Sequence, residues 1–470
     1  MSRGLFRWDD AGVRRALGLE GVVEPRPLEF SEVGTDTRAL LPGSLFVALR
    51  GERFDGHDYL AEAAAQGARA AVVSDPDTTE GPLPTYPVRD TLVALGQLAR
   101  FRRRALAASV VALTGSSGKT TVKELLRAGL GAEHRVHATP GNLNNRVGLP
   151  LTLLDTPDDA EWVVVELGTN EPGEIGILTR IAEPDAALVT TVSESHLEGL
   201  GGLEGVLAEK LDLLVNLRPG APAMVGELPS ALPARARAIR EEVGVAGFGD
   251  GADPEFRGHP GSPDAQGRVP FHYLDREIHP RLPGRHGASN VLLALALMHR
   301  LKVGLAPAVP AVEQVEPGGL RGEWRQVGGM RLMLDCYNAN PQSVRAALAL
   351  LASLPGTGPR VAVLGSMLEL GPRSRELHRQ ILDEAMALPL TLVVGVGIFH
   401  EVREEVQATS PEFLSAPDLD QAWAQLRPHL QGEETVLLKG SRGMAMERLV
   451  PRFQEAFGAE PGPESGEEEG

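Results

Sequence analysis

Ser109-Val-Val-Ala-Leu-Thr-Gly-Ser-Ser-Gly-Lys-Thr-Thr-Val-Lys-Glu124 is the stretch of sequence that decides the fold. Its first six residues, Ser109 to Thr114, are mostly apolar and β-branched, which is typical of a buried strand. Gly115 and Gly118 then turn the chain, and the residues from Lys119 onward predict a helix. A buried strand joined to a helix by a short glycine-rich turn indicates a parallel α/β sheet.

The turn after this strand has the composition of a phosphate-binding loop. Its glycines let backbone N–H groups close on phosphate oxygens, and the helix adds the partial positive charge of its N-terminus. Lys119 can reach the terminal phosphates, and Thr120 offers a hydroxyl to Mg²⁺. We therefore expect an ATP site at Thr114, Gly115, Ser116, Ser117, Gly118, Lys119, Thr120 and Thr121. The longer P-loop pattern has a glycine where this chain has Leu113, so an ordinary glycine-rich turn is the alternative interpretation.

Apolar runs that alternate with helical segments continue on both sides of the loop. The expected strands cover residues 44–49, 68–73, 162–167, 186–192, 332–334, 360–364, 390–394 and 435–438. Leucine spacing predicts an amphipathic helix over residues 90–106. Pro82, Pro84 and Pro87 predict a hinge before that helix. A glycine- and proline-rich stretch over residues 306–319 separates two later sets of strands.

These patterns predict an α/β protein of three domains. A small N-terminal α/β domain covers residues 1–86, and a central domain covers residues 87–314. The central domain has a P-loop-type, mostly parallel sheet with helices on both faces. A Rossmann-like α/β domain follows over residues 315–457, and residues 458–470 form an acidic tail that we expect to be disordered.

The overall composition excludes several classes of protein. The 470 residues carry a net charge of −17, which argues against a nucleic-acid or anionic-membrane surface. Hydrophobic residues make up 42%, enough for packed cores, but no apolar run approaches the length of a membrane span. The single cysteine excludes an internal disulfide, and residues 1–10 lack a signal-peptide core. We expect a cytoplasmic monomer.

Three further residues are candidates for chemistry. Glu166 ends a hydrophobic strand, where ligands of α/β sheets bind, so its carboxylate could meet the Mg²⁺ at Thr120. His196 follows another strand, although a lone histidine is more often structural. Lys210 lies on an expected helix, where a solvent-exposed position is the simpler interpretation. Only five of the 46 basic residues are lysines, however, and this favours a role that arginine cannot fill.

The motifs together resemble the Mur ligase family from about residue 30 to about residue 450. The matching segments run in family order. They are Thr35-Asp-Thr-Arg38, Pro42 to Asp58, the phosphate loop, Gly141-Asn-Leu-Asn-Asn-Arg-Val-Gly-Leu-Pro150, Glu166-Leu-Gly168, His196-Leu-Glu-Gly199, Lys210, Leu282-Pro-Gly-Arg-His286, Asn290, Asp335-Cys-Tyr-Asn-Ala-Asn-Pro341, Met367-Leu-Glu-Leu-Gly371 and Lys439-Gly-Ser-Arg442. The Tyr-Asn-Ala-Asn-Pro and Met-Leu-Glu-Leu-Gly segments are typical of the members that add D-alanyl-D-alanine.

The resemblance implies a substrate set and a role for each matching residue. The expected substrates are ATP, UDP-N-acetylmuramoyl-tripeptide and D-alanyl-D-alanine, joined through an acyl phosphate, with two Mg²⁺ ions. Lys119, Lys210, Glu166, His196 and Arg321 resemble the catalytic residues. Thr120, Glu166, His196 and a carbamylated Lys210 resemble the metal ligands, and Asn290, Arg321 and Asp335 resemble further ATP contacts. Thr35, Asp36, Thr37, Arg38, Asn142, Asn145, Asn338, Asn340, Lys439 and Ser441 resemble substrate-binding residues.

Two positions depart from the family pattern. Gly287 replaces an asparagine that contacts adenine, and Ser366 replaces an acidic residue before Met367. The alternatives are a folylpolyglutamate synthetase-like ligase of the same superfamily, a P-loop kinase and a nucleotide-binding scaffold. The Asp-Thr-Arg and Phe-Asp-Gly-His-Asp segments speak against the first. A kinase would release ADP without an amine acceptor, and a scaffold would never release phosphate.

Overall fold

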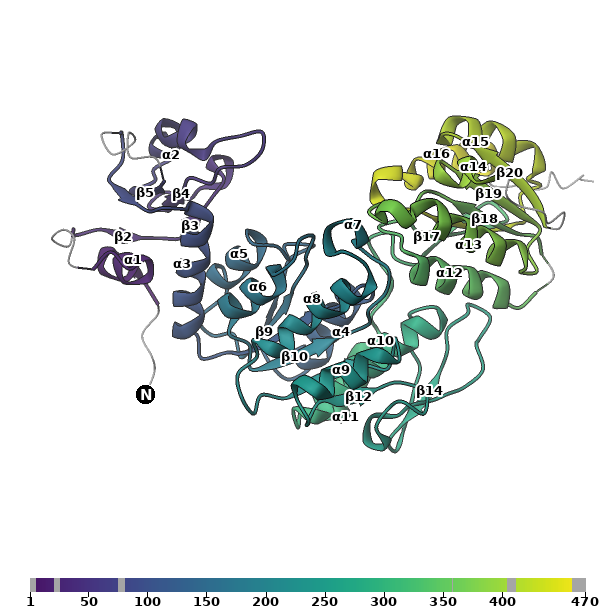
Figure 1. The fold of residues 1–470 in the computed structure, drawn as a ribbon, viewed down its shortest axis with the longest axis horizontal. Coiled ribbons are helices and arrows are strands. Elements are labelled where there is room, and N and C mark those ends of the chain that lie inside the picture. Colours follow the sequence, from purple (N-terminus) through teal and green to yellow (C-terminus); the bar gives the residue numbers. More distant parts are fainter. Residues whose placement is uncertain (1–5, 21–25, 75–80, 357, 404–410, 459–470) are drawn as a thin grey trace, which may run out of the picture.

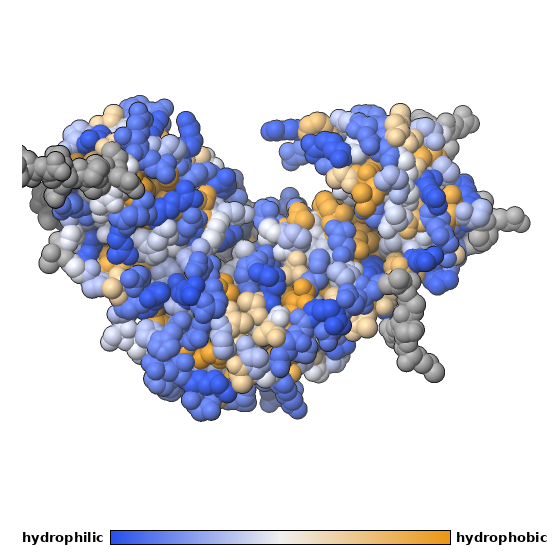
Figure 2. Space-filling model, turned by 180° about the vertical axis from the view of Figure 1, so that it is seen from behind, coloured by the Kyte–Doolittle hydropathy of each residue, from blue (hydrophilic) through white to orange (hydrophobic). Residues whose placement is uncertain are grey.

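The computed structural model describes residues 6–20, 26–74, 81–356, 358–403 and 411–458. The chain forms three lobes, each built around one main sheet (Figure 1). The N-terminal and C-terminal lobes stand on either side of the central lobe, and a notch separates them when the molecule is seen from behind (Figure 2). The expected mixed α/β fold with parallel sheets is confirmed. Of the expected tail, only Gly458 belongs to the described residues.

The N-terminal lobe contains a four-stranded parallel sheet in the order β3-β4-β5-β6. Its strands are β3 (Val33–Gly34), β4 (Leu45–Val47), β5 (Ala70–Val73) and β6 (Thr85–Pro87). A two-stranded ribbon, β1 (Trp8–Asp9) with β2 (Glu29–Phe30), and the helices α1 (Asp10–Leu17) and α2 (Leu60–Ala65) complete it. Short 3₁₀ turns, η1 (Thr37–Ala39) and η2 (Gly56–Tyr59), follow the carboxyl ends of β3 and β4.

The prediction of a hinge at Pro82, Pro84 and Pro87 is wrong at Pro87, because Thr85–Pro87 form strand β6, whereas Pro82 and Pro84 precede the strand. β6 pairs only with β5 and so lies at the edge of its sheet. Proline lacks an N–H donor and is tolerated at such an edge, where no further ladder bond is required. The carbonyl of Pro84 still accepts the N–H of Ala71 at 2.9 Å.

The central lobe contains a six-stranded, fully parallel sheet in the order β12-β11-β10-β7-β9-β8. Its strands are β7 (Ser109–Thr114), β8 (Val136–Ala138), β9 (Trp162–Glu166), β10 (Ala186–Val189), β11 (Ala223–Gly226) and β12 (Gly244–Ala246). The quoted segment occupies β7 in the middle of the sheet, where four of its six residues are completely buried apolar side chains. A small antiparallel sheet, β13 (His259–Pro260), β14 (Phe271–Tyr273) and β15 (Arg276–Ile278), was not predicted.

Helices cover both faces of the central sheet, as expected. One buried apolar cluster contains residues of α3 (Thr91–Ala105), α5 (Gly148–Leu154), α6 (Glu174–Ala182), α7 (Leu197–Leu200), α8 (Leu203–Val215) and α9 (Ala231–Ile239). A second cluster contains residues of α4 (Lys119–Gly131), α10 (Gly284–Arg300) and α11 (Leu305–Glu313). None of the described helices is both long and apolar enough to span a bilayer.

Helix α11 corrects the interpretation of residues 306–319 as a separating stretch, since only the part after Glu313 is irregular. Pro307 lies in the first turn, where a missing N–H breaks no helical hydrogen bond. Ala308, Val309 and Val312 are buried in the same apolar cluster as α4. Tertiary packing of this apolar face overrides the unfavourable proline at position 310.

The C-terminal lobe contains a six-stranded sheet in the order β16-β17-β21-β18-β19-β20, parallel except for β16. Its strands are β16 (Glu323–Val327), β17 (Met330–Asp335), β18 (Arg360–Leu364), β19 (Leu392–Val396), β20 (Glu412–Ala416) and β21 (Thr435–Lys439). Its helices are α12 (Pro341–Ser353), α13 (Ser374–Met386), α14 (Ile398–Glu401), α15 (Leu419–Leu426) and α16 (Val450–Phe457). The edge strands β16 and β20 were not predicted.

The C-terminal lobe is docked on the central lobe. One apolar cluster runs from the central helices into α12 and α13 without interruption. A hydrogen bond of 3.1 Å joins Asn340 Nδ2 to the hydroxyl of Ser117 in the phosphate loop. Residues from both lobes therefore meet at the carboxyl edge of the central sheet, where ligands of parallel sheets bind.

Candidate active site

The phosphate loop lies between β7 and α4, as the sequence predicts, and two glycines shape it. Gly115 and Gly118 have φ values of 151° and 81°, a range that favours glycine. A Cβ atom on Gly115 would lie 2.0 Å from Thr190 Oγ1, and one on Gly118 would lie 2.5 Å from Asn290 Oδ1. The predicted ATP contact Asn290 thus lies directly against the loop, and a larger residue at either glycine would need a strained backbone and displaced neighbours.

The serines of the loop form hydrogen bonds with the segment after β10. The hydroxyl of Ser116 accepts the Ser193 N–H at 3.0 Å and contacts Ser195 Oγ at 2.9 Å. The carbonyl of Ser117 accepts the Thr190 hydroxyl at 2.6 Å. Thr114 donates its hydroxyl to the Leu167 carbonyl at 2.8 Å. These hydroxyls hold the loop in shape, which pre-organises its backbone for phosphate.

Lys119 lies at the start of α4 and folds over the loop. Its Nζ donates to the Gly115 carbonyl at 2.8 Å. Burial lowers the pKa of Lys119, the nearby Glu166 carboxylate opposes this shift, and the Arg321 guanidinium adds to it. The structure therefore brings together two cations and one carboxylate that the sequence predicted for the site. The Arg321 guanidinium lies 3.8 Å from the centre of the Tyr337 ring, which orients it by a cation–π contact.

Glu166 ends β9 and has the environment of a cation ligand. Its side chain is buried, and Oε1 accepts a hydrogen bond of 2.8 Å from Asn144 Nδ2. Oε2 is buried without any hydrogen-bond partner among the described residues. A buried carboxylate oxygen without a donor is costly unless a cation compensates it. The hydroxyl of Thr120, at the start of α4, makes no hydrogen bond to a described residue, so both atoms fit a hard cation such as Mg²⁺.

Lys210 is 1% exposed on α8, which contradicts the simple interpretation of a solvent-exposed helix position. Burial lowers its pKa well below the ordinary lysine value, and the nearby Lys119 ammonium adds to this. The other two buried lysines differ: Lys123 donates to the Thr139 carbonyl and Lys439 to the Asn338 carbonyl, each at 2.7 Å. Lys210 Nζ makes no hydrogen bond to a described residue, although the carboxylates of Glu209, Glu166 and Glu174 act on it electrostatically and oppose the lowering of its pKa. A buried amine with a depressed pKa is a candidate for covalent chemistry.

Glu209, the residue before Lys210, anchors this part of α8. Its buried carboxylate accepts the N–H groups of Gly173 at 2.6 Å and Ile175 at 2.8 Å, at the start of α6. Thr169 Oγ1 donates to the same carboxylate at 3.1 Å. These bonds satisfy free N–H groups at a helix N-terminus and fix α8 against the loop after β9. The position of Lys210 relative to Glu166 is thereby set.

The described residues contain no group of three or more His, Cys, Asp or Glu side chains that could hold a metal ion by themselves. Mg²⁺ in phosphate-transfer sites usually has only one or two protein carboxylates, with water and substrate phosphates as the other ligands. The arrangement of Glu166 and Thr120 therefore fits a cation that binds together with a nucleotide.

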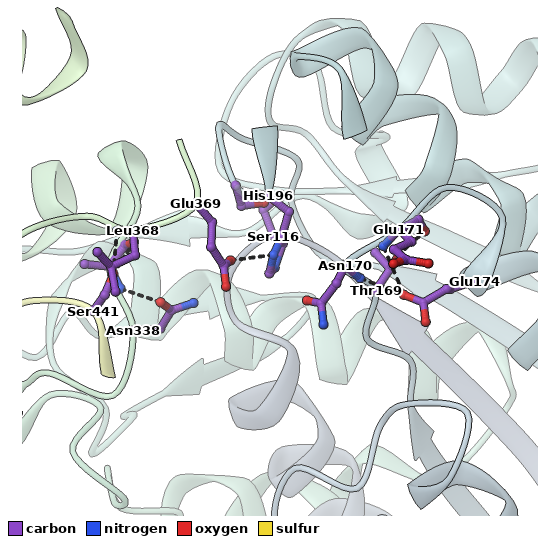
Figure 3. A network of polar contacts seen from close by, with 12 residues as sticks. Ser116, Thr169, Asn170, Glu171, Glu174, His196, Asn338, Leu368, Glu369 and Ser441 are labelled. Carbon is purple, nitrogen blue, oxygen red and sulfur yellow. Dashed lines mark hydrogen bonds and ion pairs between the residues drawn. The ribbon is translucent and has the colours of Figure 1, made fainter. Parts of the chain in front are cut away.

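His196 lies just before α7 and meets the C-terminal lobe (Figure 3). Its Nδ1 lies 2.6 Å from Glu369 Oε2, and this contact lowers the pKa of the Glu369 carboxyl. Nε2 makes no hydrogen bond to a described residue, and the imidazole is partly exposed. One ring nitrogen is therefore committed to a carboxylate, and the other is left for a ligand.

The predicted C-terminal residues bind mostly to one another. Lys439 Nζ lies 3.0 Å from Asp335 Oδ2. Asn340 caps α12 and reaches Ser117, while Ser441 Oγ accepts the N–H of Leu368 at 2.9 Å. Asn338 is exposed and its side chain accepts the Ala339 N–H at 2.9 Å. Lys439, Asn340 and Ser441 are nearly fully buried, so they support the exposed Asn338 and do not themselves form the surface.

The predicted N-terminal residues lie on their own lobe. Asp36 pairs with Arg38 through bonds of 2.9 and 2.6 Å, and these hydrogen bonds lower the pKa of Asp36 to about 2. Thr37 donates to Glu62 at 2.8 Å, and Thr35 is half-buried beside them. They follow β3 at the carboxyl edge of the N-terminal sheet, and the structure shows no contact between them and the phosphate loop.

The loop before α5 holds residues that the sequence singled out and one that it missed. Asn142 is exposed, and Asn145 Oδ1 accepts the Gly148 N–H at 2.8 Å at the start of α5. Asn144, between them, was not predicted although it is the residue that binds Glu166. Glu209 and Glu369 were also missed. Glu209 precedes Lys210, and Glu369 is the glutamate of the Met-Leu-Glu-Leu-Gly segment, but neither position indicates in the sequence which residue its carboxylate contacts.

We predict that Asn144→Ala raises the Mg²⁺ concentration needed for half-maximal binding of an ATP analogue by about tenfold. Loss of a hydrogen bond that orients a metal-ligating carboxylate typically costs 10- to 100-fold in metal affinity. Calorimetric titration at several Mg²⁺ concentrations measures the effect. Asn170→Ala, an exposed asparagine in the next loop, is the matched control. Equal Mg²⁺ dependence in both variants would show that Asn144 does not orient the Glu166 carboxylate for metal binding.

Known proteins resemble this chain over most of its length. Family models described as "Mur ligase family, catalytic domain", "Mur ligase middle domain" and "Mur ligase, glutamate ligase domain" match residues 29–103, 113–298 and 320–442. The UDP-N-acetylmuramoyl-tripeptide–D-alanyl-D-alanine ligase of Escherichia coli (strain K12) is 36% identical over 448 residues, covering 93% of this chain and 96% of that protein.

Solved structures give the same result. MurF from Acinetobacter baumannii matches with a TM-score of 0.87 and 30% identity, covering 96% of this chain and 100% of that one. The MurF ligase from Thermotoga maritima in complex with ADP matches with a TM-score of 0.80 and 27% identity, covering 90% and 97%. The sequence matches extend in order through all three lobes, and this chain belongs to the Mur ligase family.

Proposed function

We propose that this chain is the ATP-dependent ligase that joins D-alanyl-D-alanine to UDP-N-acetylmuramoyl-tripeptide, giving the UDP-linked pentapeptide, ADP and phosphate. The observation that carries the proposal is the meeting of Lys119, Glu166 and Lys210 with Arg321 of the C-terminal lobe around one phosphate loop. Relatives that share most of the chain's length carry the name of this activity.

The chemistry explains why the site gathers cations. A carboxylate does not react with an amine in water, because its oxygen is too poor a leaving group. The tripeptide carboxylate therefore attacks the γ-phosphorus of ATP, and the bond from that phosphorus to the β,γ-bridging oxygen breaks to release ADP. The D-alanyl-D-alanine amine then attacks the acyl carbon, and inorganic phosphate leaves. The first step brings two anions together, so positive charge must be concentrated there.

Each residue near the loop has a part in that arrangement. Lys119 and the loop N–H groups hold the β- and γ-phosphates, and Arg321 approaches from the C-terminal lobe. Thr120 and Glu166 would hold one Mg²⁺, and His196 with a carbamylated Lys210 a second. When bound, Mg²⁺ neutralises phosphate charge. Asn290 and Asp335 lie where adenosine contacts are expected, and Gly287, which packs on Leu282, cannot donate a side-chain hydrogen bond to adenine.

The lobes divide the substrates between them. We assign the UDP-sugar to the N-terminal domain, residues 1–86, through Thr35, Asp36, Thr37 and Arg38, and the nucleotide to residues 87–314. Asn142 and Asn145 belong to the tripeptide side. The dipeptide is assigned to residues 315–457, where Asn338 is the exposed contact and Asn340, Lys439 and Ser441 support it. A cytoplasmic monomer remains the predicted form.

We predict that phosphate release requires both substrates. With ATP and UDP-N-acetylmuramoyl-tripeptide alone, we expect no sustained turnover, because the acyl phosphate has no amine acceptor. Adding D-alanyl-D-alanine should start steady release of one phosphate per pentapeptide, measured by a coupled phosphate assay and mass spectrometry. Sustained ADP release without the dipeptide would indicate a kinase. The absence of any phosphate release would indicate a nucleotide-binding scaffold. Turnover with folates in place of the UDP-linked substrate would indicate a folylpolyglutamate synthetase-like ligase.

A further inference from the structure

The contact between His196 and Glu369 joins two lobes at the edge of the phosphate site. His196 belongs to the central lobe and Glu369 to the C-terminal lobe, and their side chains point toward one another beside Ser116 (Figure 3). Both residues have positive φ values, 52° for His196 and 65° for Glu369, and residues other than glycine rarely adopt such values. Such backbone strain at a contact is typical of functional positions.

The loop that carries Glu369 is held from beneath before it reaches His196. The N–H of Met367 donates to Nε2 of the fully buried His378 at 2.8 Å, and His378 Nδ1 lies 2.7 Å from the Ser374 carbonyl. The next residue, Leu368, donates its N–H to Ser441 Oγ. Two consecutive N–H groups are therefore fixed, so Glu369 projects from a rigid support although its own side chain is largely exposed.

The same loop is packed against the residues that follow His196. A Cβ atom on Gly371 would lie 3.3 Å from Glu198 Cα, so the two segments are closely packed at this point. The Glu198 N–H also faces the Glu369 carbonyl at 3.4 Å. The segments on either side of the ion pair are thus in contact, and the pair is part of an interface rather than an isolated surface bridge.

The pairing determines which nitrogen of His196 is available. A carboxylate acceptor places the ring proton on Nδ1, which leaves Nε2 unprotonated and able to bind a cation or accept a hydrogen bond. Histidines that bind metals commonly donate their other ring N–H to a carboxylate in this way. Without such a partner, a neutral imidazole exchanges between two tautomers and rotates more freely.

We propose, on the basis of the function proposed above, that Glu369 is a positioning residue that fixes the tautomer and orientation of His196. Because Glu369 comes from the C-terminal lobe, His196 is prepared for its role only while that lobe is docked. The hydrogen bond from Asn340 to Ser117 crosses the same interface and ties the phosphate loop to the same docked state. Metal binding and lobe docking are therefore coupled through one side chain.

The tautomer of His196 gives a direct test. The full-length protein is labelled with ¹⁵N-histidine, and the His196 signals are assigned by their loss in His196→Asn. We expect an Nδ1-protonated, Nε2-unprotonated pattern in the wild type and a mixed or Nε2-protonated pattern in Glu369→Ala. Glu369→Gln keeps an acceptor oxygen and should retain the wild-type pattern. An unchanged pattern in Glu369→Ala overturns the proposal.

The affinity for Mg²⁺ gives the second readout. We expect Glu369→Ala to need about 10- to 100-fold more Mg²⁺ for half-maximal binding of an ATP analogue, with most of this loss restored in Glu369→Gln. Glu376→Ala, which removes an exposed glutamate of α13 paired with Arg373, is the control and should match the wild type. Equal Mg²⁺ dependence in Glu369→Ala and the control also overturns the proposal.

Neither measurement uses the UDP-linked substrate or the dipeptide. A wild-type protein that fails to release phosphate with both substrates would contradict the proposed function. A wild-type tautomer pattern or Mg²⁺ dependence in Glu369→Ala would contradict only the positioning role.

Discussion

Lys119→Ala is expected to lower the rate of phosphate release by about 10²- to 10³-fold, the usual cost of removing one group that stabilises transition-state charge. The Lys119 ammonium lies over the phosphate loop, 2.8 Å from the Gly115 carbonyl, and meets Glu166 and Arg321 electrostatically. Its removal takes one positive charge away from the proposed γ-phosphate site. Steady-state phosphate assays at saturating ATP measure the effect, so that weaker nucleotide binding does not hide it.

The same variant should retain its affinity for UDP-N-acetylmuramoyl-tripeptide, because the predicted UDP contacts lie on a separate lobe. Lys302→Ala is the control, since Lys302 is exposed and lies after α10, outside the phosphate loop. Unchanged phosphate release in Lys119→Ala would contradict a role of the phosphate loop in the mechanism. A parallel loss of binding for the UDP-linked substrate would indicate damage to the fold instead of a local effect.

Lys210→Ala is expected to reduce ligation by at least about 100-fold, and short carboxylates such as acetate or formate should partly restore it. The neutral amine forms a bond to the carbon of CO₂ and loses a proton, which yields a carbamate anion. An exposed lysine, with a pKa of about 10.4, is neutral in about one molecule in a thousand near pH 7.4. Burial and the Lys119 ammonium lower the pKa of Lys210, so its neutral form is far more abundant.

Two further measurements separate a carbamate from an ordinary lysine. Removing dissolved CO₂ and bicarbonate should lower wild-type activity, most strongly at acid pH, because protonation of the amine below its pKa competes with the adduct. Lys210→Arg keeps a positive charge but cannot add CO₂, so it should be as inactive as Lys210→Ala. Full activity of Lys210→Ala without any additive would contradict a carbamate role.

The elements predicted well are those with a strong local pattern. Strand β7 and its neighbours β9 and β10 are mostly apolar because both faces of the sheet are covered, and such runs are visible in one sequence. The errors fall where tertiary context overrides local preference. The prolines at β6 and in α11 predict interruptions of secondary structure, but an edge strand and a well-packed helix tolerate them.

The candidate site was predicted in part for the same reason. Gly118, Lys119 and Thr120 are consecutive and form a local phosphate-binding motif, so the sequence alone predicts them. Asn144 and Glu369 are not, because their importance comes from partners that only folding brings near. The sequence likewise does not show that the buried ammonium of Lys439, a predicted substrate-binding residue, contacts Asp335 and donates to the Asn338 carbonyl.

The sequence by itself determined the central strand–loop–helix unit, the α/β class and the list of groups that carry the chemistry. Only the tertiary structure decided which of them act together. Ser117 and Asn340 are separated by 223 residues yet share a hydrogen bond. Lys210 makes no hydrogen bond to a described residue, whereas the buried Lys123 and Lys439 each donate to a backbone carbonyl. The physical reason is that propensity and periodicity act over a few residues, whereas desolvation and charge pairing depend on every group that folding places nearby.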